Sequence, residues 1–535
     1  MSEKSTWRKR ITAALAAGAL LVTLPLSGCN NTDKGGKDES KTSQTVSETT
    51  EKVPDTKFGD GIVAQSKTYK IKYSVMEYLL NYMFTNFYNN YGGANYFDTT
   101  KDLKKQYYNE EEKVSWFDYF TGTTKNYLTQ VMVFSEGAKE AGIKLSEADE
   151  STLSEGFDMM TSVAAESSMT VDEFVKSTYG SHVTKADVEE IQRMTILAQN
   201  YNNYLIDNFR YTDEQYEEFY EKDKNSYRKA DYLVYSFPYT DATDEEKAKL
   251  KEYADGLANC KDQKEYEAYL VDYLKNNRNL VSLPQTSESS ITEEQFNSAI
   301  EAQVESTMNK GVAYNDSNDA YKWIFSEDRK ANDATNIDLN NAYNAIMILK
   351  PIYRDETATR NVRHILITEQ TEGSDAAAKK KAEDILNEWK DGAQDEESFG
   401  ELATKYTEDP GPKNTGGLYS GVVPGQMVGE FNDWLFDSKR KVGDTDIVKT
   451  TYGYHIMYYS GPGLKSWQNS VDSDMRKKDL SDKYEEMKKT YPVEFDDDAI
   501  SNMIIKMPAS EESSSSVNID SVAPSSETPE SSTEE

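Results

Sequence analysis

The chain has 535 residues and a formal net charge of −34 at pH 7, with 94 Asp and Glu against 60 Lys and Arg. This length predicts two to four domains. The excess of acidic residues argues against nucleic acid as a partner, because nucleic-acid binding depends on Lys and Arg that neutralise phosphates. There are only two cysteines, Cys29 and Cys260, which excludes zinc sites built from pairs of cysteines.

The N-terminus has the pattern of a secretory signal. Basic residues at 8–10 precede an apolar stretch from Ile11 to Leu24, which is shorter than the roughly 20 residues that span a bilayer. The run 26–29, Leu-Ser-Gly-Cys, resembles the lipobox of bacterial lipoproteins. The resemblance implies cleavage before Cys29, lipidation of its thiol and attachment to the extracytoplasmic face of the cell membrane. The alternative is an ordinary cleaved signal followed by an incidental cysteine.

A helical domain is predicted after a polar tether at 30–57. Ser74 and Glu77 have the spacing of a capping box, which predicts that a helix begins there. No proline occurs between Pro54 and Pro238, as expected of helices. Further helices are predicted at Trp116–Ala141, Thr170–Lys176, Lys185–Ile206, Tyr211–Lys224 and Ser466–Tyr491.

Residues 360–460 carry the densest set of motifs. Apolar and polar positions alternate around His364, which predicts a buried strand carrying one histidine. Residues 378–389 place their apolar side chains on one face of a helix, and Phe399 begins a shorter helix. The motifs that follow are Tyr406-Thr-Glu-Asp409, Gly416-Gly417, Gly425-Gln-Met427 and Gly453-Tyr-His455-Ile456.

In order and spacing these motifs resemble the rotamase domain of parvulin-type peptidyl-prolyl isomerases. With the lipoprotein signal and the flanking helices, the whole chain resembles the PrsA-type foldase lipoproteins and, more distantly, the SurA-type periplasmic chaperones. The resemblance implies an α+β fold, in which the parvulin domain is a four-stranded antiparallel sheet surrounded by helices and the segments before and after it form one helical module. It implies no cofactor.

The resemblance also implies roles for particular residues. His364, Asp409 and His455 would form the catalytic polar centre. The loop after Gly416 departs from the usual Gly-Asp-Leu-Gly form, so the sequence leaves open which of two neighbouring residues, 418 or 419, faces the substrate. The substrate-binding positions implied by the resemblance are Met427, Phe431, Tyr419, Leu418 and Tyr452.

Two other interpretations of the histidines stay open from the residues alone. His364 and His455 have the pattern of core histidines whose hydrogen bonds are satisfied internally. A metal site is possible for two histidines and one aspartate, but the sequence supplies no further ligand, so no metal is predicted.

Residues 225–352 resemble a worn second copy of the same domain. Between Trp323–Asp333 and Trp434–Asp444, the residues Trp, Phe, Arg, Lys and Asp recur at the same offsets. On this alignment Tyr232 replaces the first histidine and Ala345 the second, which predicts a parvulin-like domain without the catalytic pair. The alternative is chance similarity around one amphipathic helix.

The leading hypothesis is a peptidyl-prolyl isomerase and folding factor for exported proteins, whose partners are unfolded or partly folded chains with X–Pro bonds. The first alternative is a non-catalytic holdase chaperone that binds chains through its parvulin-like domains. The second is a structural lipoprotein with neither activity. The predicted organisation is a signal peptide at 1–28, a tether at 29–57, a helical chaperone-like domain at 58–224, a degenerate parvulin-like domain at 225–352, a parvulin domain at 358–462, a C-terminal helix and extension packing on the helical domain at 463–507, and an acidic Ser-rich tail at 508–535.

Overall fold

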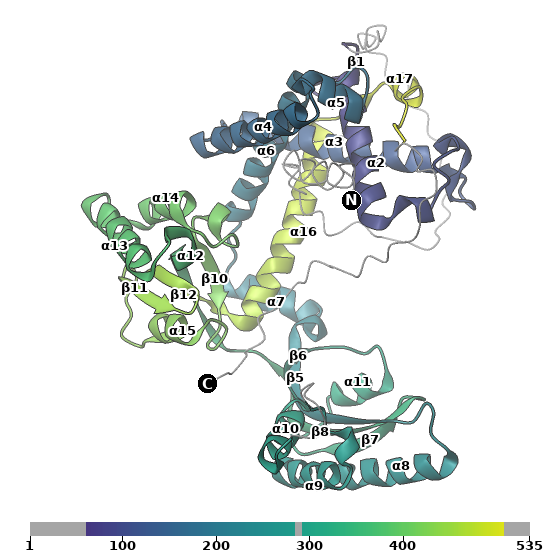
Figure 1. Ribbon diagram of the computed structural model, residues 1–535, viewed down its shortest axis with the longest axis vertical. Coiled ribbons are helices and arrows are strands. Elements are labelled where there is room, and N and C mark those ends of the chain that lie inside the picture. The colour runs from purple at the N-terminus through teal and green to yellow at the C-terminus, as the bar shows by residue number, and fades with distance from the viewer. Residues whose placement is uncertain (1–59, 284–290, 508–535) are drawn as a thin grey trace. The chain divides into compact units, whose positions relative to one another are not determined.

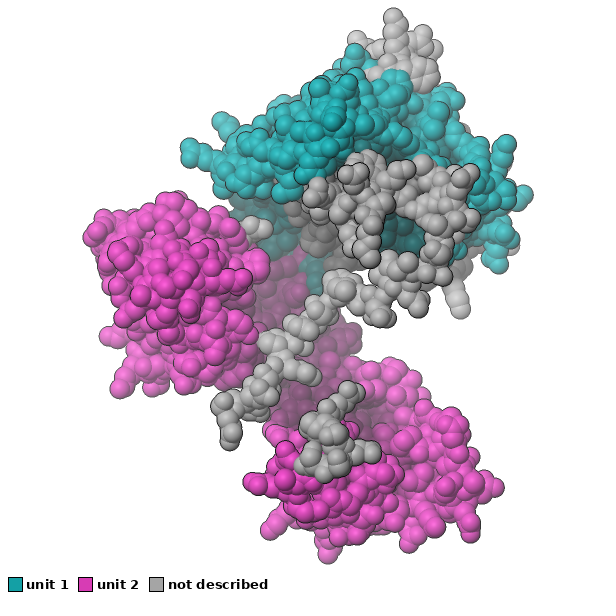
Figure 2. Space-filling model, in the orientation of Figure 1, with its two compact units in different colours: residues 1–209, 477–535 teal, residues 210–476 magenta. Residues whose placement is uncertain are grey.

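The computed structural model describes residues 60–283 and 291–507. Within them the chain divides into two compact units, one from the described parts of 1–209 and 477–535 and the other from 210–476 (Figure 2). The expected signal, the lipidation site at Cys29, the tether and the tail lie outside the described residues. No described helix is long and apolar enough to cross a membrane.

The first unit is mainly helical. Helices α3 to α6 each begin with a capping box, in which a Ser or Thr side chain and the carboxylate three residues later satisfy exposed backbone N–H groups. The helices are α2 (Tyr73–Tyr91), α3 (Trp116–Glu140), α4 (Glu147–Glu166), α5 (Val171–Tyr179), α6 (Lys185–Asn208), α17 (Asp497–Ser501) and the end of α16 (Ser466–Thr490); the strands are β1 (Ile62–Gln65), β2 (Lys70–Lys72), β3 (Tyr107–Asn109), β4 (Val114–Ser115) and β13 (Glu494–Phe495).

The capping box predicted at Ser74 and Glu77 is wrong. Helix α2 begins at Tyr73, directly after β2, and both Ser74 and Glu77 are buried. The N–H of Tyr73 donates to the carbonyl oxygen of Gly61, so the helix start has a backbone partner instead of a side-chain cap. Glu77 accepts a hydrogen bond from the backbone N–H of His182 at 3.1 Å.

The core of the first unit takes residues from both ends of the described chain. Strand β13 pairs antiparallel with β1, and Ile500 and Met503 are buried in the same apolar cluster as Leu79 and Val131. The backbone N–H of Lys506 donates to the side-chain oxygen of Asn81 at 2.6 Å. The segment after residue 477 is therefore part of the structure of this unit.

The second unit holds two four-stranded antiparallel sheets (Figure 1). Their strand orders are β6-β5-β8-β7 and β10-β9-β12-β11, so the same topology occurs twice in succession. The first sheet comprises β5 (Arg228–Pro238), β6 (Met308–Ala313), β7 (Ala334–Asp338) and β8 (Ala342–Arg354), with helices α8 (Asp244–Ala258), α9 (Gln263–Asn276), α10 (Glu293–Glu305) and α11 (Asp319–Ile324); helix α7 (Asp213–Lys222) precedes it.

The second sheet corresponds to the motif-rich stretch of the sequence. Its two central strands, β9 and β12, carry the two histidines, and the predicted α+β architecture is confirmed. The elements are β9 (Ala358–Ile367), β10 (Leu418–Val422), β11 (Thr445–Thr450) and β12 (Gly453–Lys465), with α12 (Glu369–Glu372), α13 (Asp375–Asp391), α14 (Glu396–Tyr406) and α15 (Gly429–Phe436).

The register of the first sheet corrects the sequence alignment by one residue. Leu366 pairs with His455 in the second sheet, and the equivalent of Leu366 in the first, Val234, pairs with Ile346. Ile346 therefore occupies the position of the second histidine. Ala345 points to the opposite face, because successive residues of a strand alternate between faces.

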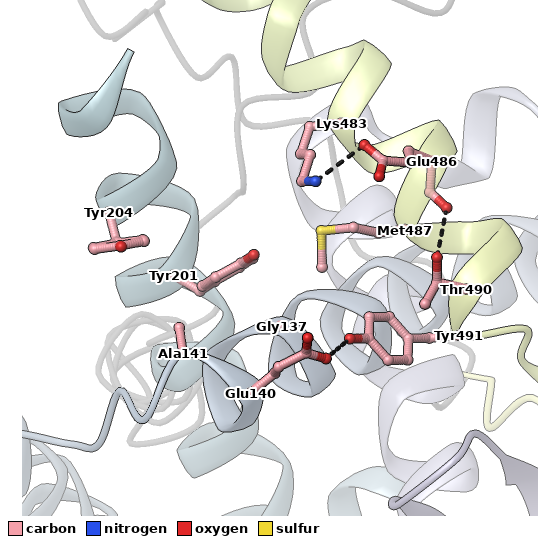
Figure 3. A pocket seen from close by; sticks show the side chains of 10 residues that line it. All are labelled: Gly137, Glu140, Ala141, Tyr201, Tyr204, Lys483, Glu486, Met487, Thr490 and Tyr491. Carbon is pink, nitrogen blue, oxygen red and sulfur yellow. Dashed lines mark hydrogen bonds and ion pairs between the residues drawn. The ribbon is translucent and has the colours of Figure 1, made fainter.

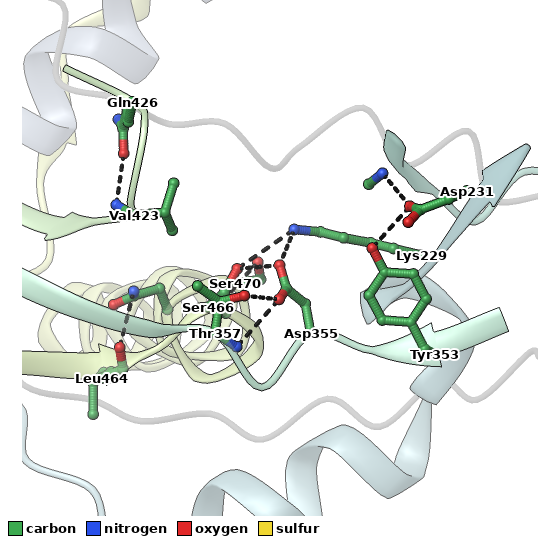
Figure 4. A network of polar contacts seen from close by, with 12 residues as sticks. Lys229, Asp231, Tyr353, Asp355, Thr357, Val423, Gln426, Leu464, Ser466 and Ser470 are labelled. Atoms are coloured by element: carbon green, nitrogen blue, oxygen red, sulfur yellow. Dashed lines mark hydrogen bonds and ion pairs between the residues drawn. The ribbon is translucent and has the colours of Figure 1, made fainter. Parts of the chain in front are cut away.

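A polar network in the second unit links the two sheets' connecting segments (Figure 4). The Nζ of Lys229, on β5, lies 2.7 Å from Oδ2 of Asp355, between β8 and β9. The hydroxyl of Ser466, at the start of α16, donates to the same oxygen at 2.7 Å. Asp355 thus holds together the starts of β5 and α16 at the point where the chain passes from one sheet to the next.

Candidate active site

The two histidines of the second sheet form a buried pair. His364 on β9 and His455 on β12 are only 1% and 5% exposed, and their Nδ1 atoms lie 3.0 Å apart. The rings are nearly parallel, with centroids 5.3 Å apart and an angle of 18° between their planes. They meet because the residue beside His455 in the register is Leu366, two positions from His364 on the same face of the sheet.

Each end of the histidine pair meets an oxygen atom. The hydroxyl oxygen of Thr450 lies 2.9 Å from Nε2 of His455. Oδ2 of Asp409 lies 3.0 Å from Nε2 of His364, an ion-pair distance without good hydrogen-bond alignment. Asp409 also accepts hydrogen bonds from the hydroxyl of Tyr419 at 2.9 Å and the backbone N–H of Gly411 at 3.0 Å.

The protonation of this chain of groups follows from its neighbours. The close contact with His364, together with the hydrogen bonds from Gly411 and Tyr419, lowers the pKa of Asp409 to about 2. Burial, with the neighbouring His364, lowers the pKa of His455 from 6.5 to about 4. Near pH 7 the site therefore holds an ionised carboxylate and a neutral His455. Only one of the two facing Nδ1 atoms can carry a proton, so the pair has one donor and one acceptor.

Aromatic and apolar side chains cover the pair. Phe431, on α15, presents its ring edge-on to both histidines, with centroid distances of 5.5 Å to His364 and 5.4 Å to His455. Tyr419 stacks on His364 at 5.2 Å. Met427 packs partly buried against the cluster that contains Phe431. The site is therefore a row of polar groups, from Thr450 through the two histidines to Asp409, beside an apolar surface formed by Phe431 and Met427.

Two residues named from the sequence lie away from this cluster. Leu418 pairs with Arg363, whereas Tyr419 pairs with Val362, so the pleat places Tyr419 on the His364 face and Leu418 on the opposite face. Tyr452 is in the turn between β11 and β12, and 60% of its surface is exposed. The structure thus places Tyr419, and not Leu418 or the exposed side chain of Tyr452, beside the histidines.

Thr450 is the site residue that the sequence interpretation missed. It is buried at the end of β11, opposite Gly453, in the hairpin that leads to His455. The available signal was the short spacing between Thr450 and His455 around a turn, which allows a hairpin to bring them together.

Two glycines of the sequence motifs are required by close backbone contacts. Gly417 has φ +73°, and a Cβ there would lie 2.3 Å from the carbonyl oxygen of His364. Gly453 has φ +143°, and a Cβ there would lie 2.4 Å from the carbonyl oxygen of Ile367. Both contacts are with β9, so these glycines let neighbouring segments approach the strand that carries His364.

Among its described residues, the first sheet has no comparable polar centre. Tyr232 and Ile346 occupy the positions of the two histidines, and both are buried in an apolar cluster with Ala320 and Ile324 of α11. The structure therefore shows the same strand order with an apolar interior where the second sheet has its histidine pair.

The chain is similar to known proteins over part of its length. Residues 346–461 match the family described as the PPIC-type PPIase domain. The chain is 34% identical over 161 residues to the foldase protein PrsA of Staphylococcus aureus, a match that covers 27% of this chain and 49% of that protein. It is 37% identical over 110 residues to the chaperone SurA of Pseudomonas putida, covering 21% of this chain and 24% of that protein.

The chain thus spans about half, or less, of the length of these curated relatives. Among solved structures, PrsA from Bacillus subtilis aligns with 60% of this chain and 86% of its own, at 17% identity and a TM-score of 0.18. The family match, at 346–461, includes strands β9, β10 and β11 and most of β12 of the sheet that carries the histidine pair. Residues 346–461 therefore match a PPIC-type PPIase domain, and the chain is similar to PrsA and SurA proteins over part of its length.

Proposed function

We propose that this protein is a peptidyl-prolyl cis/trans isomerase and folding factor for exported proteins, held at the outer face of the cytoplasmic membrane by a lipid on Cys29. The observation that carries the isomerase proposal is the buried His364–His455 pair, with Asp409 at one end and the ring of Phe431 above it. The signal-like N-terminus and the lipobox pattern before Cys29 support the location.

The chemistry of the reaction suits such a site. Rotation about an X–Pro bond has a barrier of about 18–20 kcal/mol because amide resonance is lost, and no covalent bond is broken. A thousandfold acceleration needs only about 4 kcal/mol of preferential binding to the twisted amide. In this proposal Phe431 and Met427 hold the proline ring, and no residue acts as a nucleophile.

The histidines are assigned a positioning role. Three of their four ring nitrogens form hydrogen bonds within the site, and the fourth, Nε2 of His364, lies 3.0 Å from Oδ2 of Asp409, so all four face groups of the protein. Because His455 is neutral and Asp409 is ionised, each hydrogen bond in the row from Thr450 to Asp409 has a fixed donor and a fixed acceptor. These fixed hydrogen bonds hold Tyr419, Phe431 and Met427 in one arrangement. The side chains of the site therefore need to move less when the substrate amide twists.

The test is catalysis of Ala-Pro isomerisation in a short peptide by the protein from residue 30 onward. We expect Met427→Ala and His455→Ala each to reduce the acceleration about tenfold or more. Ile346→Ala, at the position of the first sheet that is equivalent to His455, is the matched control and should leave the rate unchanged. A protein whose circular dichroism spectrum shows a native fold but which gives no acceleration would contradict the proposal.

A second candidate function is chain binding without catalysis. The first sheet has the topology without the histidine pair, and the helical unit exposes several large aromatic side chains. A holdase activity that is undiminished in folded His455→Ala, measured as suppression of aggregation of an unfolded protein, would favour this function alongside or instead of isomerisation. The most exposed aromatic side chains of the helical unit are Tyr91, Tyr96, Tyr107 and Tyr108.

A further inference from the structure

The helical unit contains a cavity that the isomerase proposal does not use (Figure 3). Its volume is about 360 Å³, and its lining comes from α3, α6 and the end of α16. Tyr201, Met487 and Tyr491 are buried and form its floor. The helix α3 contributes Gly137 at the point of closest approach, where a Cβ would lie 2.4 Å from the Tyr201 ring and 2.5 Å from the Met487 methyl group.

Aromatic rings and carboxylates meet in this cavity. Tyr201 and Tyr204 are one helical turn apart, with ring centroids 6.1 Å apart and an angle of 21° between the planes. Tyr204 is 47% exposed, so one ring is at the rim. Glu140 and Glu486 are both exposed beside the cavity, from different helices. The faces of the rings and the carboxylates all favour a positively charged group.

The cavity has one cation of its own. Nζ of Lys483 lies 3.0 Å from Oε2 of Glu486, whereas Glu140 accepts a hydrogen bond from the hydroxyl of Tyr491. With two carboxylates and one ammonium group, the lining keeps a negative charge. An anionic or purely apolar ligand would have to be placed against this charge, which disfavours both classes.

We propose that this cavity binds the guanidinium group of an arginine in an extended polypeptide. A guanidinium group is planar and has five N–H donors, so it can stack flat on a tyrosine ring while it reaches carboxylates on two sides; an ammonium group has three donors and no plane that could stack. The rim residues Tyr204, Glu486 and Thr490 are exposed, which leaves room for the backbone of the bound chain outside the cavity.

The arginine comes from another chain in this proposal. Residues 508–535 contain neither Lys nor Arg, and residues 30–59 contain no Arg. The net charge of −34 attracts positively charged segments over a distance before any contact forms. The inference rests on the proposed folding-factor function for the source of the chain, but it does not depend on the histidine pair.

The test is a fluorescence-anisotropy titration of the protein from residue 30 onward with a blocked, unstructured peptide that has one central arginine. The same peptide with citrulline, which keeps the shape and removes the charge, should bind about tenfold more weakly or not at all. Glu486→Gln and Tyr204→Ala should each weaken binding of the arginine peptide about three- to tenfold. Glu485→Gln, one position away on the same helix and outside the cavity lining, is the matched control and should have no effect.

Lys483→Ala gives a prediction of the opposite sign. Removing the internal cation frees Glu486 for the ligand, so the arginine peptide should bind about threefold more tightly. Such a gain of affinity cannot come from a variant that merely fails to fold. Equal binding of the arginine and citrulline peptides, or equal effects of Glu486→Gln and Glu485→Gln, would overturn the proposal.

Two further experiments test whether the ligand is a polypeptide and whether its binding depends on the isomerase site. N-acetylarginine amide should bind about tenfold more weakly than the peptide; equal affinity would overturn the assignment to a polypeptide. His455→Ala should leave peptide binding unchanged. Arginine-dependent binding by a parent protein that shows no isomerase activity would sink the isomerase proposal alone, whereas full activity of the parent protein without arginine-dependent binding would sink the cavity proposal alone.

Discussion

His455 ties the stability of the isomerase domain to pH. Its pKa is about 4 in the folded protein and near the usual 6.5 in the unfolded chain, because burial disfavours the imidazolium ion. Between these values the unfolded chain binds the extra proton, so stability falls as the pH is lowered from about 7 to 4. This group alone should cost about 3 kcal/mol over that window, with no further loss below it.

The measurement is urea denaturation of the protein at several pH values, followed through the unfolding of this domain. In His455→Gln the pH dependence between 7 and 5 should be markedly flatter, because the titrating group is absent. His182→Gln, in the helical unit, is the control and should keep the slope of the parent protein. Parallel pH profiles for the parent and His455→Gln would show that His455 is not buried as a neutral ring.

The sequence named three residues that the structure brings together, His364, Asp409 and His455. It did not name Thr450, whose contact with His455 depends on the register of a hairpin. It also left Leu418 and Tyr419 as alternatives, because only pairing with β9 decides which of two adjacent residues lies on the His364 face. For single residues, the sequence predicts which chemical groups the site contains, and the pairing of the strands decides which of these groups are in contact.

At the scale of elements, the hairpin between β11 and β12 depends on Gly453. Its φ of +143° is rare for other residues, and a Cβ would lie 2.4 Å from the carbonyl oxygen of Ile367 on the neighbouring strand. We expect Gly453→Ala to reduce the free energy of unfolding of this domain by about 2–4 kcal/mol and to lower isomerase activity, since β9 and β12 carry the histidines.

The control for Gly453→Ala is Gly429→Ala, at the start of α15, where a Cβ would meet nothing within 4 Å. Thermal unfolding of both variants measures the difference. The same small change in the midpoint for both variants would contradict the close contact between Gly453 and β9.

Strand register also explains why the sequence alignment placed Ala345, and not Ile346, at the position of the second histidine. The alignment of Trp323 with Trp434 matches helices α11 and α15, but it carries no information on how β8 pairs with β5. A slip of one residue exchanges the faces of a strand, so Ala345 and Ile346 change places between two separate apolar clusters. The repeat itself is supported by the identical strand order of the two sheets.

At the scale of the whole molecule, the helical unit depends on residues after 477. The buried Met487, Ile500 and Met503 belong to its core, and β13 extends its sheet. We expect a protein ending at residue 476 to lose the folded helical unit, because apolar side chains that these residues cover would be exposed to water. The second unit, 210–476, should keep its own unfolding transition.

Differential scanning calorimetry checks this expectation. The protein ending at 507 should show the transitions of both units, and the protein ending at 476 only that of the second. Addition of a separate peptide comprising 477–507 should restore part of the missing transition. An unchanged calorimetric trace for the truncated protein would contradict the shared core.

The sequence by itself determined the parvulin-type domain, since its histidines, glycines and turn motifs lie within one contiguous stretch whose spacing reflects a single sheet. It also determined the helical character of much of the remainder, because helices are specified by local periodicity and caps. Only the tertiary structure decided what depends on residues distant in the chain. The 3.0 Å contact between His364 and His455, the face on which Ile346 lies and the cavity between α3, α6 and α16 all arise from pairing and packing of segments far apart in sequence. Local patterns do not encode such contacts, because register and helix packing are selected by burial of the whole core.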